Sequence, residues 1–151
     1  MKRNVIISIS VLVVVIITSA VVWAFSPVKN LKPSDYDDGI TIQQVEQQEK
    51  PVILLFYADW CTYCLKFMPK YKVLKNLYKK DFNFVMLNID VPENKKYIED
   101  FYISFFPTLC IYDPKIDNKI FLPNAIYGDM NLLKKEIERY LRIRKMIKIE
   151  N

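Results

Sequence analysis

The sequence predicts an α/β protein with a central mixed β-sheet that helices cover on both faces, preceded by one N-terminal transmembrane helix. Three observations lead to this fold class. A long uncharged apolar stretch occupies the N-terminus, continuous apolar runs alternate with segments of helical spacing after it, and the last two strand-like runs are separated only by a turn. Two parallel strands joined through a helix, followed by an antiparallel pair, build such a sheet.

The transmembrane helix is predicted over residues 5–25, which contain no charged side chain. As a helix this stretch would be about 31 Å long, which matches the hydrocarbon thickness of a bilayer. Lys2 and Arg3 precede it, and the positive-inside rule keeps them in the cytoplasm and sends the rest of the chain across. A cleaved signal segment is the alternative, although the apolar run is longer than the ~7–15 residues usual for a signal.

Three parts follow from these patterns. Residues 1–25 form the membrane anchor or signal segment. Residues 26–39 are polar, contain Pro27 and Pro33, and are interpreted as a linker. Residues 40–151 form one folded domain. The expected location is therefore a single-pass membrane protein whose folded domain is periplasmic or otherwise extracytoplasmic.

The first half of the domain is predicted to alternate helices and buried strands. Thr41 can cap a short helix that runs to residue 48 and is stopped by Pro51. The continuous apolar runs 52–57 and 82–89 are typical of strands buried on both faces. Between and after them, helical spacing of apolar residues predicts helices over 61–79 and 93–102.

The second half of the domain is predicted to be a hairpin followed by a helix. Residues 107–112 form the third strand, and residues 120–126 pair back as the fourth after a turn rich in Asp and Asn. Gly128 and Asp129 then introduce an amphipathic helix. Its apolar face is formed by Leu133, Ile137, Tyr140 and Leu141.

The composition excludes several classes of function. The chain has no histidine, which excludes Ser-His-Asp and Cys-His hydrolases and His-ligated metal sites. Its 2 glycines are too few for a phosphate-binding loop, and its 3 cysteines do not make a disulfide scaffold. The net charge is +5, and without Lys2 and Arg3 it is +3, which is mild for a domain. The basic residues near the C-terminus are interpreted as a solvated helix face, so no nucleic-acid partner is expected: Arg142, Arg144, Lys145 and Lys148.

Cys61 and Cys64 lie where a predicted buried strand ends and a helix begins. Residues i and i+3 are neighbours on a helix, so the two sulfurs can form a disulfide. The unpaired N–H groups at a helix N-terminus favour the thiolate of Cys61, which is the nucleophile of disulfide exchange. Cys64 lies one turn further in, is expected to be more buried, and would resolve the mixed disulfide. Zinc would need four ligands, but two cysteines could hold Cu(I).

The residues around the cysteine pair resemble the active site of the thioredoxin family. The stretch FYADWCTYC over 56–64 is followed by Pro69 five residues after the second cysteine. Leu87-Asn88-Ile89-Asp90 looks like the family's strand end, Phe106-Pro107-Thr108 like its cis-proline loop, and Tyr127-Gly128 like the glycine before its last helix. The resemblance covers roughly residues 40–141, and YADWC looks most like the thioredoxin-like domain of bacterial membrane-bound thiol-disulfide interchange proteins.

This resemblance implies a three-layer thioredoxin-like fold and a thiol-disulfide oxidoreductase. Cys61 would attack, Cys64 would resolve, and Phe106 with a cis Pro107 would present an extended substrate segment. Trp60 would shield Cys61, and Thr62 with Tyr63 would shape the substrate surface. The alternative role of Tyr63 is to cover the disulfide by packing. The implied partners are protein disulfides and a membrane or thioredoxin-type electron donor, without a cofactor or a metal.

The chain departs from the family pattern at two buried positions. Leu55 stands where the family usually has a buried aspartate, and Met86 where a lysine often accompanies it. The usual proton acceptor for Cys64 is therefore missing. Because this proton acceptor is missing, the alternative function is a non-catalytic binding module or a Cu(I)-binding chaperone with the same fold.

Two further features bear on the chemistry. Thr62-Tyr63 lacks the histidine that helps stabilise the thiolate in strongly oxidising relatives, so we expect a reductant. Cys110, in the third strand, is expected to be a buried free thiol that acts as a small apolar residue.

Overall fold

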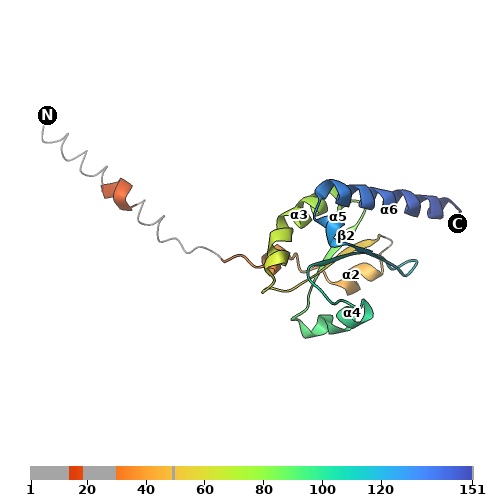
Figure 1. The fold of residues 1–151 in the computed structure, drawn as a ribbon, viewed down its shortest axis with the longest axis horizontal. Helices are drawn as coiled ribbons and strands as arrows, with labels where there is room; N and C mark the ends of the chain where they lie inside the picture. The colour runs from red at the N-terminus through yellow and green to blue at the C-terminus, as the bar shows by residue number, and fades with distance from the viewer. Residues whose placement is uncertain (1–13, 19–29, 49, 151) are drawn as a thin grey trace, which may run out of the picture. The chain divides into compact units, whose positions relative to one another are not determined.

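A four-stranded mixed sheet of order β2-β1-β3-β4 lies at the centre of the fold (Figure 1). The computed structural model describes residues 14–18, 30–48 and 50–150. β1 (Val52–Tyr57) pairs in parallel with β2 (Asn83–Asn88) and antiparallel with β3 (Thr108–Asp113). β4 (Asn118–Leu122) pairs antiparallel with β3 at the sheet edge. The mixed sheet predicted from the order of apolar runs is thus confirmed.

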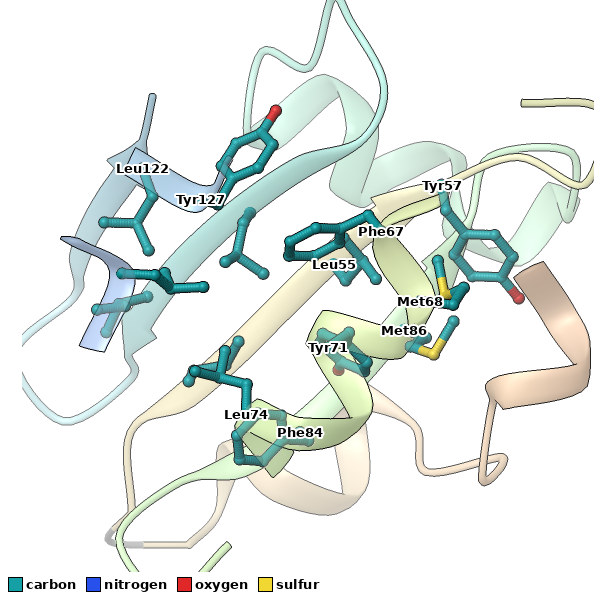
Figure 2. Packing of buried hydrophobic residues seen from close by; sticks show 14 of the residues in the cluster. Leu55, Tyr57, Phe67, Met68, Tyr71, Leu74, Phe84, Met86, Leu122 and Tyr127 are labelled. Carbon is teal, nitrogen blue, oxygen red and sulfur yellow. The ribbon is translucent and has the colours of Figure 1, made fainter. Parts of the chain in front are cut away.

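Helices cover both faces of this sheet, which gives three layers. The odd-numbered β1 residues Ile53, Leu55 and Tyr57 pack in one cluster with α3 (Thr62–Tyr78) and α6 (Met130–Glu150). The even-numbered residues pack in a second cluster with α2 (Ile42–Glu46) and α4 (Lys95–Asp100). All six β1 residues are therefore buried, each contributing roughly 1.5–3 kcal/mol of transfer free energy. Figure 2 shows the first cluster around Leu55 and Tyr71.

Several elements differ from the sequence prediction at their ends. α2 is shorter than the predicted 41–48, although Thr41 caps it through a reciprocal pair of hydrogen bonds with Gln44. A 3-10 turn, η2 (Pro92–Asn94), precedes α4. The fourth strand ends at Leu122, because Pro123 has no N–H for the ladder and instead starts a four-residue helix, α5 (Asn124–Tyr127). The predicted strand 120–126 is therefore wrong in its second half.

The segment predicted as a linker contributes to the fold from Leu31 onward, where the compact unit Leu31–Asn151 begins. It contains a 3-10 helix, η1 (Pro33–Tyr36), that contacts α3. The backbone N–H and the hydroxyl of Ser34 donate to the two carboxylate oxygens of Asp59 at 3.0 and 2.9 Å. These bonds hold the segment against the loop that precedes Cys61.

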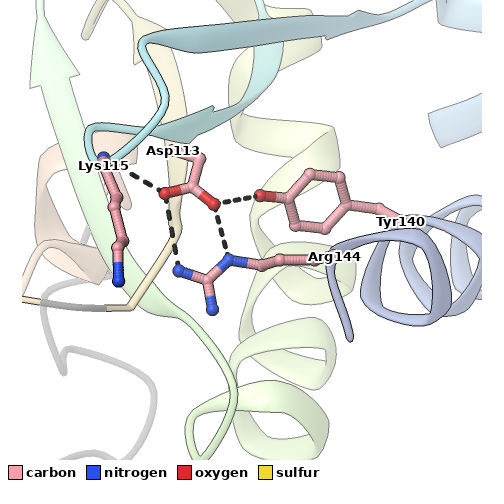
Figure 3. Close-up of polar contacts among 4 residues, drawn as sticks. All are labelled: Asp113, Lys115, Tyr140 and Arg144. Carbon is pink, nitrogen blue, oxygen red and sulfur yellow. Dashed lines mark hydrogen bonds and ion pairs between the residues drawn. The ribbon is translucent and has the colours of Figure 1, made fainter. Parts of the chain in front are cut away.

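The last helix is held against the sheet by a buried polar cluster (Figure 3). The Asp113 carboxylate accepts a hydrogen bond from the Tyr140 hydroxyl at 2.8 Å and another from Nε of Arg144 at 2.5 Å. Burial alone would raise the pKa of Asp113, but the bonds from Arg144 and Tyr140 outweigh it and hold that pKa below its ordinary value. The end of β3 and the C-terminal half of α6 are therefore joined by a charged pair.

The predicted transmembrane helix, residues 5–25, lies largely outside the described residues. Residues 14–18 are helical. In the part of the chain that the structure describes, no helix combines the length and the apolar character needed to cross a bilayer.

Candidate active site

Cys61 and Cys64 form a disulfide at the N-terminus of α3, with their Cα atoms 5.2 Å apart. Cys61 is the N-cap residue, and the Cys64 N–H donates to its sulfur at 3.0 Å. A side-chain acceptor at this position satisfies one of the unpaired N–H groups of the first helical turn. A helix N–H donor at this position would also stabilise a Cys61 thiolate once the disulfide is reduced.

The two cysteines differ in their access to solvent. Cys61 is 7% exposed, whereas Cys64 is completely buried in the cluster under α3. Cys61 is therefore the more accessible of the two cysteines to an incoming disulfide. This asymmetry agrees with the prediction that the second cysteine is the more buried one.

Aromatic side chains surround the disulfide on the protein surface. Trp60 is 68% exposed, and its ring meets the edge of the Phe106 ring at a centroid distance of 6.3 Å. The Trp60 indole N–H donates to Asp90 at 3.4 Å. Tyr63 is 74% exposed. Large exposed aromatics beside a reactive disulfide are suited to contact with another polypeptide.

The Phe106–Pro107 peptide bond is cis, as the family resemblance predicts. Pro107 is buried, and its carbonyl accepts a 2.6 Å hydrogen bond from the Tyr127 hydroxyl. The hydroxyl of Thr108 donates to the Phe105 carbonyl at 2.6 Å on the other side of the bend. Tyr127 was not among the predicted site residues, because its bond to Pro107 joins positions 20 residues apart.

An apolar groove of about 510 Å³ adjoins these residues. Its walls are formed by aromatic rings and the proline: Tyr63, Phe67, Phe105, Phe106, Pro107 and Tyr127. Lys66 and Lys70 of α3 also line it. Three of the predicted site residues thus line the same groove, namely Tyr63, Phe106 and Pro107. Thr62 is exposed and does not line it. The groove residues of α3, Lys66, Phe67 and Lys70, were missed because their helical spacing is equally typical of an ordinary helix with one buried and one exposed face.

Comparison with known proteins identifies the family. Residues 28–125 match the thioredoxin profile. The chain belongs to the thioredoxin family. The oxidised mitochondrial thioredoxin 3 of Saccharomyces cerevisiae superposes with a TM-score of 0.51 at 23% identity, covering 62% of this chain and 82% of the other. The oxidised thioredoxin of Plasmodium falciparum does so with a TM-score of 0.50 at 27% identity, covering 64% and 86%.

Curated relatives of this thioredoxin-family chain include two disulfide isomerases. Protein disulfide-isomerase 1 of Dictyostelium discoideum is 35% identical over 86 residues, which are 56% of this chain. Protein disulfide-isomerase of Drosophila melanogaster is 34% identical over 98 residues, which are 65% of this chain. The aligned regions span only 22% and 18% of those proteins, so the likeness concerns one domain of each.

The thioredoxin pattern is broken beneath the disulfide. Leu55 is fully buried in the same cluster as Cys64 and Met68, and Met86 is buried beside it on β2 (Figure 2). Neither side chain can accept a proton. The sequence predicted that no carboxylate lies at this buried position, and the packed core has Leu55 there instead.

A carboxylate from the N-terminal segment reaches the same face of the sheet. The Tyr57 hydroxyl, two residues after Leu55 on β1, donates to Asp37 at 3.5 Å. Burial raises the pKa of Asp37, and hydrogen bonds from the Gly39 N–H and from Tyr57 oppose that rise without cancelling it. Burial and the neighbouring Asp37 charge also raise the pKa of Tyr57, so the hydroxyl stays protonated and remains a donor.

Proposed function

We propose that this protein is a membrane-anchored, extracytoplasmic thiol-disulfide oxidoreductase that reduces protein disulfides through Cys61 and Cys64. The observation that carries the proposal is the asymmetry of the pair: Cys61 caps α3 and is reachable, whereas Cys64 is buried one turn further in. Membership of the thioredoxin family and the likeness to disulfide isomerases support the same chemistry.

The reaction transfers two electrons to the substrate. In the reduced protein the Cys61 thiolate attacks one sulfur of a substrate disulfide, which forms a mixed disulfide and releases the first substrate thiolate. Cys64 loses its proton and attacks the sulfur of Cys61, which forms the Cys61–Cys64 disulfide and releases the second substrate thiolate. An electron donor, either a membrane protein or a thioredoxin, then returns the pair to the dithiol.

The direction of the reaction rests on the two residues between the cysteines. Thr62 and Tyr63 offer the Cys61 thiolate no cationic side chain, and such a cation is what stabilises the reduced form of strong oxidants. Equilibration with glutathione buffers measures the potential directly. A value near that of the strong oxidants, about −120 mV, would overturn the reductant assignment.

Reduction of insulin by the dithiol form tests the enzymatic function itself. Activity is expected in the parent protein and lost in Cys61→Ser. Cys64→Ser should instead accumulate a mixed disulfide with the substrate, which non-reducing electrophoresis detects. An inactive parent protein that binds one equivalent of Cu(I) would favour a copper-binding role for the same pair.

The membrane topology is proposed from the uncharged stretch 5–25 and the two basic residues before it. A membrane-impermeant thiol reagent applied to intact, pre-reduced cells should label Cys61. Labelling only after lysis would place the domain on the cytoplasmic side and contradict this part of the proposal.

A further inference from the structure

The groove beside the disulfide combines an apolar wall with a positively charged rim. Its wall is made of aromatic rings, and Phe105 is 52% exposed within it. No acidic residue is among the described residues that line the groove. A bound segment would therefore meet apolar surface, the uncharged polar side chain of Asn124 and positive charge, but no negative charge.

The two lysines of the rim lie one turn apart on α3. The ammonium of Lys66 lies 5.8 Å from the centre of the Tyr63 ring, and no carboxylate of the described residues comes within ion-pair distance of it. The ammonium of Lys70 donates to the carbonyl of Gly128, which bears no net charge. By contrast, Lys75 on the same helix is paired with Asp38. The positive charge of the rim is thus left for a ligand.

We propose that the groove selects client segments in which a large apolar side chain lies beside the client's own disulfide cysteine. In these segments acidic residues also occupy two nearby positions, i and i+2. This proposal rests on the oxidoreductase function above. The apolar side chain of the client would contact the aromatic wall. The carboxylates of the client's acidic residues would pair with Lys66 and Lys70. Positions four apart on a helix are about 6 Å apart along its axis. Residues i and i+2 of an extended segment are about 6.6 Å apart and point to the same side, so two alternate carboxylates match the two ammonium groups.

Two peptide disulfides test this selectivity with the full-length reduced protein. Each has a phenylalanine beside its cysteine, and they differ only by glutamate or glutamine at two alternate neighbouring positions. The second-order rate constant for mixed-disulfide formation should be about fivefold higher for the glutamate peptide at low salt, the size expected of two exposed ion pairs. The ratio should fall towards one as the ionic strength rises.

Charge variants locate the effect on the groove. In Lys66→Gln/Lys70→Gln the glutamate-to-glutamine ratio should drop to about one, and Lys66→Arg/Lys70→Arg should keep it well above one. The matched control Lys72→Gln/Lys79→Gln removes the same charge from exposed positions of α3 and its C-cap that do not line the groove, and should keep the parent ratio. Equal rates for the two peptides with the parent protein, or an equal loss of selectivity in the control, would overturn the proposal.

Failure of the groove proposal is distinguishable from failure of the oxidoreductase function. The parent protein is also reacted with hydroxyethyl disulfide, which is small and uncharged. A protein that reduces this compound but does not discriminate between the peptides is an oxidoreductase without charge selection. A protein that reduces neither the small disulfide nor the peptides contradicts the proposed function itself.

Discussion

Leu55 and Met86 are direct partners in the parallel ladder between β1 and β2. The thioredoxin pattern usually has an aspartate at the first of these positions and often a lysine at the second, and in this chain both side chains are apolar. Changing only one of them would have left an unpaired charge in the core, which is strongly destabilising. The joint replacement is well packed, and it removes the proton acceptor beneath Cys64.

Leu55→Asp should restore such an acceptor at the expense of stability. We expect the free energy of unfolding to fall by about 3 kcal/mol, because apolar burial is lost and a carboxyl is buried. The same burial raises the pKa of the new carboxyl, so it becomes a usable base near neutral pH and should speed the attack of Cys64 on the mixed disulfide. Stopped-flow measurements of this step from pH 6 to 9 check the prediction.

Leu55→Asn is the matched control for that experiment, because it has nearly the same shape and polarity as aspartate but cannot accept the proton. It should be destabilised without any faster resolution. If the pH profiles of the parent protein and Leu55→Asp coincide, water or another group already accepts the proton and Leu55 has only a packing role.

Asp113→Asn should weaken the attachment of α6. Removal of the carboxylate breaks the ion pair with Arg144 at a site where the Asp113 side chain is 2% exposed and that of Arg144 14%, and we expect the free energy of unfolding to fall by about 3 kcal/mol at pH 7. The pKa of Asp113 is below its ordinary value of 3.8 in the folded protein, so its contribution is present above pH 4 and is lost as the pH falls below that range. Urea unfolding between pH 2.5 and 7 should show the two proteins converging in acid.

Asp81→Asn provides the comparison for Asp113→Asn, since Asp81 is exposed at the end of α3 and the same change there should have little effect at any pH. A constant difference between Asp113→Asn and the parent protein over the whole pH range would mean that the charge of Asp113 does not contribute.

Asp37→Asn should have the opposite pH dependence. The pKa of Asp37 is raised above 3.8 in the folded protein, so the folded state binds more protons than the unfolded state just above that pH. The parent protein should therefore lose stability as the pH rises from 3.8 through the raised pKa, and Asp37→Asn should remove this loss. Thermal unfolding at half-unit pH steps between 3.5 and 7 measures the difference, and a parallel course of the two curves would contradict the prediction.

Cys110 should be chemically inert in the folded protein. It is buried in β3, and burial raises the pKa of its thiol to about 12. Iodoacetamide at pH 8 should modify Cys61 of the reduced native protein, but Cys110 only after denaturation, as mass spectrometry would show. Cys110→Ala should lower stability by about 1 kcal/mol and leave insulin reduction unchanged. Rapid native modification of Cys110 would contradict this assignment.

Features that depend on local sequence pattern were predictable without the fold. The apolar run of β1 indicated a strand buried on both faces, and residues 53, 55 and 57 do face one helical layer while 54 and 56 face the other. The position of Cys61 between that strand and a helix determined its role as the N-cap of α3. Side-chain alternation and helix capping involve residues only two to four positions apart, so both can be recognised in the sequence alone.

Contacts between residues that are distant in the sequence became known only from the folded structure. The bond from Tyr127 to the Pro107 carbonyl, the contact of Ser34 with Asp59 and the pairing of Leu55 with Met86 each join segments about 20 to 30 residues apart. Lys66 and Lys70 line the groove only because the fold brings the cis-proline loop and α5 to the same side of α3. These contacts depend on where the sheet brings its connections together, because packing between elements, unlike hydrophobic periodicity, leaves no repeating pattern in the sequence.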